Sequence, residues 1–155
     1  MLAEGCFYWE VEILDIVPAV QFGVCAEWFE AREDPDGEGA GDDAFSWAVC
    51  GFRQEQWHKG EGLEFGSTWI VGDVIGFALD MRSAGAAVMS VSVNGSFAAP
   101  NGPAFKDIDA PFLSPVFSAY GGQYRLNLGN RPFAHVPPHE GAYMSAHAFH
   151  LSHES

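Results

Sequence analysis

Positive charge is scarce in this sequence of 155 residues. Only 7 Lys and Arg accompany 21 Asp and Glu, which gives a formal net charge of −14 at pH 7. Nucleic acids and anionic membranes are bound largely through Lys and Arg contacts to phosphate, so such an acidic chain is a poor candidate for either. The charge favours solubility first and, as a second reading, selection of basic partners.

Cysteine and long apolar runs are also sparse. The three cysteines, Cys6, Cys25 and Cys50, are odd in number and far apart, which argues against a disulfide framework and against a zinc site. Their apolar surroundings predict buried free thiols and hence a reducing, cytoplasmic location. No stretch approaches the roughly 20 apolar residues of a membrane helix, and the acidic N-terminus does not resemble a signal peptide. We therefore expect no direct membrane insertion.

Aromatic and apolar residues are plentiful, at 14% and 48% of the chain, and they alternate with polar ones. In 7–14, apolar residues at every second position alternate with Tyr8, Glu10 and Glu12, which predicts a strand with one buried and one solvent-facing side. After a loop broken by Pro18, residues 20–26 form a second strand, expected to pair with the first.

Further strands are predicted along most of the chain. Val93-Asn94-Gly95 is the strongest hairpin signal, and 96–99 is expected to be the returning strand. Phe105 would fill the core from a loop at 100–109. The remaining expected strands are 45–50, 57–60, 74–80, 88–93, 112–120 and 123–128. Many short strands without a helical period predict an all-β sandwich over 5–138, with an acidic loop at 27–43 and a tail at 139–155.

Several short motifs follow the first strand in a fixed order: Ser46-Trp47, Trp57-His58-Lys59-Gly60, Gly72-Asp73-Val74-Ile75-Gly76, Val93-Asn94-Gly95 and Leu113-Ser114-Pro115. Together with the first strand, they resemble the SPRY domain family. That resemblance implies a bent antiparallel β-sandwich of the concanavalin-like jelly-roll type, and a module that binds other proteins and is not an enzyme. It implies no cofactor.

Two segments are similar to particular members of that family. Leu128-Gly129-Asn130-Arg131-Pro132-Phe133 is similar to the SPRY repeats of ryanodine-receptor-like proteins, and Pro115-Val116-Phe117-Ser118-Ala119 to the SOCS-box SPRY adaptors. The resemblance therefore implies a domain of a larger multidomain chain. Its partner would be a protein or peptide, as for a ubiquitin ligase adaptor (substrate receptor) or a scaffold module.

The resemblance also implies a partner site in the edge loops of the sandwich. Glycines there would let a partner backbone approach closely, and a rigid aromatic would supply contact area at low entropic cost. The adaptor pocket has a Trp where this chain has Gly121. Trp57 could equally be a core residue, and Tyr120 a strand-end residue. The site residues would be Asp43, Phe45, Trp57, Tyr120, Gly121, Gly122 and Gln123.

Other constellations favour ordinary structural explanations. Asp34-Pro35-Asp36-Gly37-Glu38 lacks the full ligand spacing of a calcium loop, and His147, His150 and His153 lie in the expected tail, so no metal is predicted. Glu10 with Glu12 and Asp107 with Asp109 could be paired carboxylates. Without a fuller catalytic pattern, we expect solvent-facing side chains.

Two alternatives to a free partner-binding module stay open. The domain could be a structural module packed within a larger protein such as a ryanodine-receptor-like channel. A lectin-like carbohydrate binder is a further alternative, because lectins share the sandwich architecture. It is less favoured, since the free thiols count against it.

Overall fold

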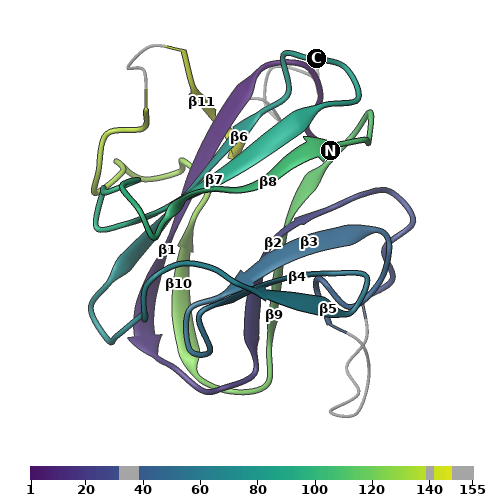
Figure 1. The fold of residues 1–155 in the computed structure, drawn as a ribbon. Coiled ribbons are helices and arrows are strands. Elements are labelled where there is room, and N and C mark those ends of the chain that lie inside the picture. Colours follow the sequence, from purple (N-terminus) through teal and green to yellow (C-terminus); the bar gives the residue numbers. More distant parts are fainter. Residues whose placement is uncertain (32–38, 139–141, 148–155) are drawn as a thin grey trace.

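The computed structural model describes residues 1–31, 39–138 and 142–147. Its elements are all strands, and they form two sheets packed face to face (Figure 1), so the predicted antiparallel β-sandwich is confirmed. The strands are β1 (Cys6–Asp15), β2 (Val20–Cys25), β3 (Ser46–Cys50), β4 (Glu55–His58), β5 (Glu61–Glu64), β6 (Val74–Asp80), β7 (Ala87–Val93), β8 (Gly102–Ile108), β9 (Ser114–Ala119), β10 (Gln123–Asn127) and β11 (Met144–Ser145).

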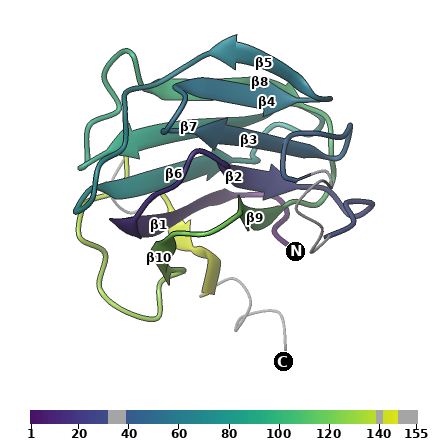
Figure 2. The same cartoon turned by 90° about the horizontal axis from the view of Figure 1, so that it is seen from below.

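The strand order explains how the sandwich is closed on one side only. The six-stranded sheet runs β10-β1-β6-β7-β8, with β11 beside β1, and the five-stranded sheet runs β5-β4-β3-β2-β9. A tight turn joins β9 to β10, so these two edge strands meet at one side of the sandwich. At the other side the edge strands are β5 and β8, which do not pair with each other (Figure 2).

The core lies between the two sheets and is rich in aromatic rings. Trp9 of β1 stacks on Phe77 of β6 with ring centroids 5.7 Å apart, and Phe22 of β2 lies 5.8 Å from Trp69. Burying each such side chain stabilises the fold by roughly 1.5–3 kcal/mol relative to leaving it in water. The predicted inward face of β1 is confirmed, because Phe7, Trp9, Val11 and Ile13 are all buried.

The outer face of β1 is covered too, which the alternation did not predict. Glu10 is only 2% exposed, and its two carboxylate oxygens accept hydrogen bonds from the backbone N–H groups of Ala134 and His135 at 2.7 and 3.0 Å. The expectation that Glu10 faces solvent was therefore wrong. Alternation along a strand shows which side chains are polar but not whether another segment covers them. Here the covering segment, around Ala134, lies more than 120 residues further along the chain.

We call residues 128–147, as far as they are described, the C-terminal strap. Phe133 of the strap packs edge-on against Tyr8, at 4.8 Å between ring centroids. Met144 and Ser145 form β11 and pair in parallel with Phe7 and Tyr8. A strand thus occurs within the range 139–155, where the sequence pattern showed none.

The first two strands do not pair with each other, contrary to expectation. β1 pairs with β6 and β10, while β2 pairs with β3 and β9 in the opposite sheet. The loop containing Pro18 carries the chain from one sheet to the other. Each strand turns an apolar face towards the other sheet, so the two strands meet across the core rather than along a shared edge.

The predicted hairpin after β7 is right at its turn and wrong in its returning strand. Asn94 and Gly95 adopt positive φ of 51° and 84°, as a two-residue turn requires, but only Val93 and Ser96 form a bridge beyond it. The strand that pairs with β7 is β8, in the range expected to be a loop. β5 was also missed, because Glu61–Glu64 has too few apolar residues to alternate.

Candidate functional site

The inner face of the five-stranded sheet changes character from its centre to its open edge. Cross-strand partners point to the same face, so the register places Trp47, His58 and Glu61 on the inner side with Val24. Towards β2 this face is apolar and buried, whereas at β4 and β5 it carries a histidine and a carboxylate. A face with that composition is built to meet water or a ligand rather than a sealed core.

Trp47 and His58 form the centre of this polar part. Their rings stack with centroids 4.6 Å apart and planes 10° from parallel. The Nδ1 of His58 lies 2.8 Å from the carbonyl oxygen of Ser46, and since a carbonyl only accepts, Nδ1 carries the proton in this bond. The bond and the stack together hold both rings in place.

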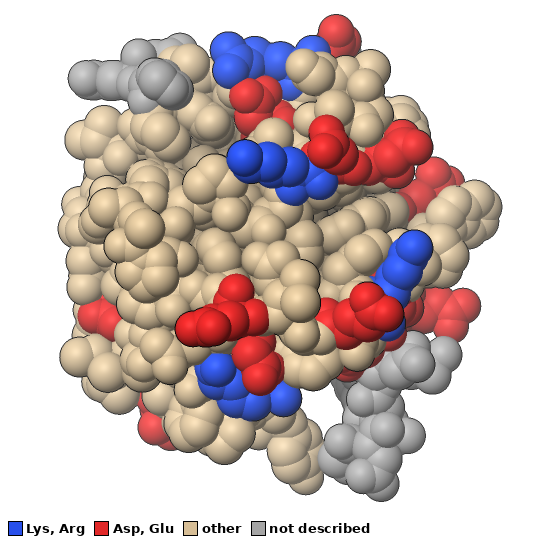
Figure 3. Space-filling view, viewed as in Figure 1, with Lys and Arg blue, Asp and Glu red and all other residues tan. Residues whose placement is uncertain are grey.

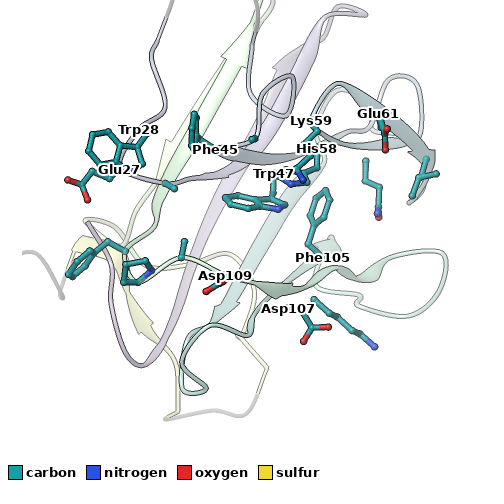
Figure 4. A pocket seen from close by; sticks show the side chains of 18 residues that line it. Glu27, Trp28, Phe45, Trp47, His58, Lys59, Glu61, Phe105, Asp107 and Asp109 are labelled. Carbon is teal, nitrogen blue, oxygen red and sulfur yellow. The ribbon is translucent and has the colours of Figure 1, made fainter.

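An open cleft lies in front of these rings, between the open edges of the two sheets. Its volume is about 700 Å³. Figure 4 shows Trp47 at its centre, with Phe45 and Trp28 along one wall and Asp109 on the opposite wall. It is lined by Ala26, Glu27, Trp28, Ala44, Phe45, Trp47, Gln56, His58, Lys59, Glu61, Leu63, Phe105, Lys106, Asp107, Asp109, Ala110, Pro111 and Phe112.

Two predicted site residues, Asp43 and Phe45, belong to the loop that leads into β3. The Asp43 carboxylate accepts hydrogen bonds from the Phe45 N–H at 2.9 Å and from the Ser46 hydroxyl at 2.8 Å. These bonds fix the loop where the chain enters the strand. Phe45 consequently stays 41% exposed on the wall of the cleft, while Asp43 supports it from behind.

Trp57 lies on the other face of the same sheet. It pairs with Ala48 and Gly62, so it points away from the cleft that Trp47 and His58 line. Its indole N–H donates to Glu55 at 2.9 Å, and a side chain at Gly41 would come within 2.7 Å of its Cβ. The loop at Gly41 therefore packs directly on this partly buried tryptophan.

The predicted residues of the β9–β10 turn form a third, separate region. Gly121 and Gly122 adopt positive φ of 103° and 84°, which glycine alone adopts without strain. Tyr120 is 68% exposed, and its N–H donates to the Ala19 carbonyl at 3.0 Å. Gln123 is exposed at the start of β10. Because Val20 pairs with Ala119 while Cys25 pairs with Ser114, this turn lies at the end of β9 away from Phe45.

The structure thus brings Asp43 and Phe45 together at the cleft but leaves Trp57 and the Tyr120 turn elsewhere. Sequence reasoning missed Trp28, His58 and Asp109 as cleft residues. The available signal was the pattern in 55–58, where Gln56 and His58 alternate with Trp57. Choosing which of the two faces is inward requires the register with β3.

The other constellations have structural explanations or lie outside the described residues. The calcium-like segment at 34–38 and two of the three tail histidines, His150 and His153, fall outside them. Within the described ranges, no group of three or more His, Cys, Asp or Glu could hold a metal ion.

Burial is the main cause that raises the pKa of the Cys25 thiol, and the nearby Asp43 carboxylate is the second; together they raise it to about 11, so Cys25 is a neutral thiol near pH 7.

Tyr8 and Glu10 form a buried hydrogen-bonded pair on β1. Burial is the main reason that the pKa of Tyr8 is raised, and the neighbouring Glu10 carboxylate adds to it. Tyr8 therefore keeps its proton and donates it to Glu10 at 2.8 Å. Together with the two backbone donors of the strap, this bond gives the buried carboxylate three partners, which identifies it as a structural anchor.

Comparison with known proteins agrees with this architecture. The SPRY domain of human HERC1 is similar in fold, with a TM-score of 0.62, 21% identity, and coverage of 84% of this chain and 79% of that one. In the ranges that are described, no helix has the length and hydropathy to cross a membrane. The family model of the SPRY domain matches residues 6–131, and domains of this family generally act as protein-interaction modules. The chain therefore belongs to the SPRY domain family.

Proposed function

We propose that this domain is a non-catalytic module that binds a peptide or loop of a partner protein at the open edge of the sandwich. The observation that carries the proposal is the cleft of about 700 Å³, walled by Phe45 and by Trp28, which is 70% exposed. Ligand clefts typically have volumes of about 300–1,000 Å³ and an aromatic lining with a few polar groups. This cleft has room for several side chains of a partner.

The way the walls are built supports binding without a large rearrangement. Trp47 is held by its stack with His58, and Phe45 by the turn around Asp43. Rigid aromatic side chains lose little conformational entropy when a partner covers them, and such residues dominate the energetics of interfaces.

The turn from Tyr120 to Gln123 and the outer face around Trp57 remain the second part of the proposal. The turn lies about 15–20 Å from Phe45, since β9 spans six residues at roughly 3.3 Å each. A short peptide seated in the cleft would not reach it, whereas a folded partner presenting several loops could. We propose the cleft as the primary contact and the turn as a secondary one.

The biological setting follows from the same proposal. The thiols of Cys6, Cys25 and Cys50 are free, which suits a reducing cytoplasmic environment. We propose that the domain is one part of a larger chain, in which it recruits a partner as a scaffold or as a ubiquitin ligase adaptor.

A second candidate is a module that packs permanently inside a larger protein. It is favoured by Ile70 and Val71, two consecutive apolar side chains exposed in the loop before β6, away from the cleft. Such a module would self-associate when expressed alone, and Ile70→Ser with Val71→Ser would restore a monomer. A free binding module would be monomeric without these changes.

The proposed function is tested by capturing partners from cell lysate with three folded proteins: wild type, Trp28→Ala with Phe45→Ala, and Tyr120→Ala. The cleft variant is expected to lose a set of proteins that wild type and the Tyr120 variant retain. Circular dichroism and thermal melts establish that all three are folded. Identical capture by wild type and the cleft variant would contradict the cleft as the primary site.

A further inference from the structure

The cleft combines exposed aromatic faces with carboxylates. Phe45, Trp28 and Trp47 present rings to it, and Glu27 and Asp109 lie near them on either wall (Figure 4). The negative face of an aromatic ring attracts a cation within about 6 Å of its centroid, tryptophan most strongly. A carboxylate beside such a ring adds a charge-assisted hydrogen bond to the same cation.

The two carboxylates nearest the aromatic walls have no partner of their own. Across the described ranges, Glu27 and Asp109 take part in no hydrogen bond or ion pair. Other acidic side chains of this protein are engaged, as Asp80 is by Arg82 at 2.8 Å and Glu12 by Arg125 at 3.1 Å. The cleft therefore holds negative charge that its own chain leaves unneutralised.

Two lysines also line the cleft, and they do not balance its carboxylates. Lys59 and Lys106 face four acidic side chains, which also include Glu61 and Asp107. The surface around it shows the same excess, because Asp and Glu lie on both sides of the hollow between the sheets (Figure 3). With a net charge of −14, the whole molecule attracts cations and repels anions before contact.

We propose that this cleft takes the cationic side chain of an Arg or Lys from a basic segment of the partner protein. The inference rests on the proposed function, since it names the chemistry of the partner at the same site. The alkyl part of such a side chain packs on Phe45 and Trp28, and its charged end lies over Trp47, within reach of Asp109. An anionic side chain in that position would be repelled, because the four carboxylates of the cleft outnumber its two lysines.

The test uses pools of nonapeptides that are identical except for the central residue, which is Arg, citrulline or Glu, with random flanks. Citrulline has nearly the shape of Arg without its charge. Binding is followed through the indole N–H signals of ¹⁵N-labelled protein. Trp28 and Trp47 report on the cleft, and the buried core residues Trp9 and Trp69 serve as internal controls.

We expect the Arg pool to shift the Trp28 and Trp47 signals and to bind roughly tenfold more tightly than the citrulline pool. The Glu pool should bind most weakly. Equal binding of the Arg and citrulline pools, including no binding by either, would overturn the inference. The lysate experiment decides the proposed function separately, so a cleft variant that loses partners there would leave that function standing even if charge had no role here.

A matched pair of charge variants shows whether the cleft itself supplies the attraction. Asp109→Asn removes a charge inside the cleft, whereas Glu64→Gln removes one from the outer face of β5. We expect Asp109→Asn to weaken the Arg pool severalfold and Glu64→Gln to leave it within experimental error. Equal losses would mean that only the overall charge attracts the peptide, and would overturn the assignment to this cleft.

Discussion

The two sides of this sandwich differ in how their edge strands are connected and covered. At the closed side a tight turn joins β9 to β10, and the C-terminal strap covers the outer face of β1, where the buried Glu10 carboxylate has three hydrogen-bond partners. At the open side β5 and β8 remain apart, and Glu27 and Asp109 have no partner among the described residues. The same kind of side chain thus anchors the fold on one side and is left available for a partner on the other.

This contrast teaches which polar groups inform about function. A buried carboxylate that makes all its hydrogen bonds stabilises the folded state, so its removal lowers the free energy of unfolding. A carboxylate beside exposed aromatic rings contributes little to the fold, and its removal changes binding instead. The predictions below are arranged to test that division.

Glu10→Ala is expected to give the largest effect. It removes the acceptor for Tyr8, Ala134 and His135, so we expect the free energy of unfolding to fall by about 3 kcal/mol, as measured by urea denaturation. The matched control is Glu12→Ala, two residues away, whose ion pair with Arg125 is solvent-exposed and should contribute less than about 0.5 kcal/mol. Similar losses in the two variants would contradict the anchor role of Glu10.

Gly129→Ala tests the attachment of the strap itself. Gly129 has φ of +107°, and an added Cβ would collide with the Ser145 side chain of β11. We expect a loss of about 2 kcal/mol, together with faster amide hydrogen exchange in Met144 and Ser145.

Gly72→Ala is the control for that variant. Gly72 has a similar φ of +96°, but an added Cβ would meet nothing within 4 Å. Its cost should be the backbone strain alone, about 1 kcal/mol, with no change in exchange at β11. If both variants lost the same stability with the same exchange pattern, the contact between Gly129 and β11 would not be what holds the strap.

A pair of phenylalanines compares the two sides directly. Phe133 of the strap packs on Tyr8, so Phe133→Ala should lower the free energy of unfolding by about 1.5 kcal/mol. Phe45 is 41% exposed at the cleft, and Phe45→Ala should lower it by less than about 0.5 kcal/mol while weakening partner capture. A larger stability loss from Phe45→Ala than from Phe133→Ala would contradict the assignment of Phe133 to the fold and of Phe45 to binding.

These regions also show what could be predicted from the sequence. Alternation in 7–14 and 88–93 and the turn at Asn94-Gly95 indicated the strands and the sandwich, because they depend on local periodicity. The burial of Glu10 depends on a segment more than 120 residues away. The strand that returns to β7 was predicted at 96–99 but is β8, because only Ser96 bridges to Val93 after the turn. Such facts are set by tertiary packing and not by the local pattern.

The candidate site shows the same limit. Phe45 was predicted beside the site from a resemblance. The cleft itself needs the register between β3 and β4, and β8 facing them from the opposite sheet. The inward direction of His58 and the outward direction of Trp57 differ by one position along the strand. A one-residue change of register would exchange them, so the aromatic residue that lines the cleft could not be chosen without the pairing.

The smallest expected effect concerns Asp80, a partly exposed carboxylate that is paired with Arg82. Hydrogen bonding from Arg82 is the main cause that lowers the pKa of Asp80 to about 2 from its ordinary value of 3.8. Because the pKa of Asp80 is lower in the folded than in the unfolded protein, its charged form stabilises the fold at any pH above its unfolded pKa. This contribution is lost as the pH falls through 4 towards 2. Because the Arg82 side chain is largely exposed, screening by water limits it to about 0.5 kcal/mol. We expect Asp80→Asn to be less stable than wild type by that amount at pH 6 in urea denaturation, and equally stable at pH 2. A difference that persisted at pH 2 would show that Asp80 acts through its shape rather than its charge.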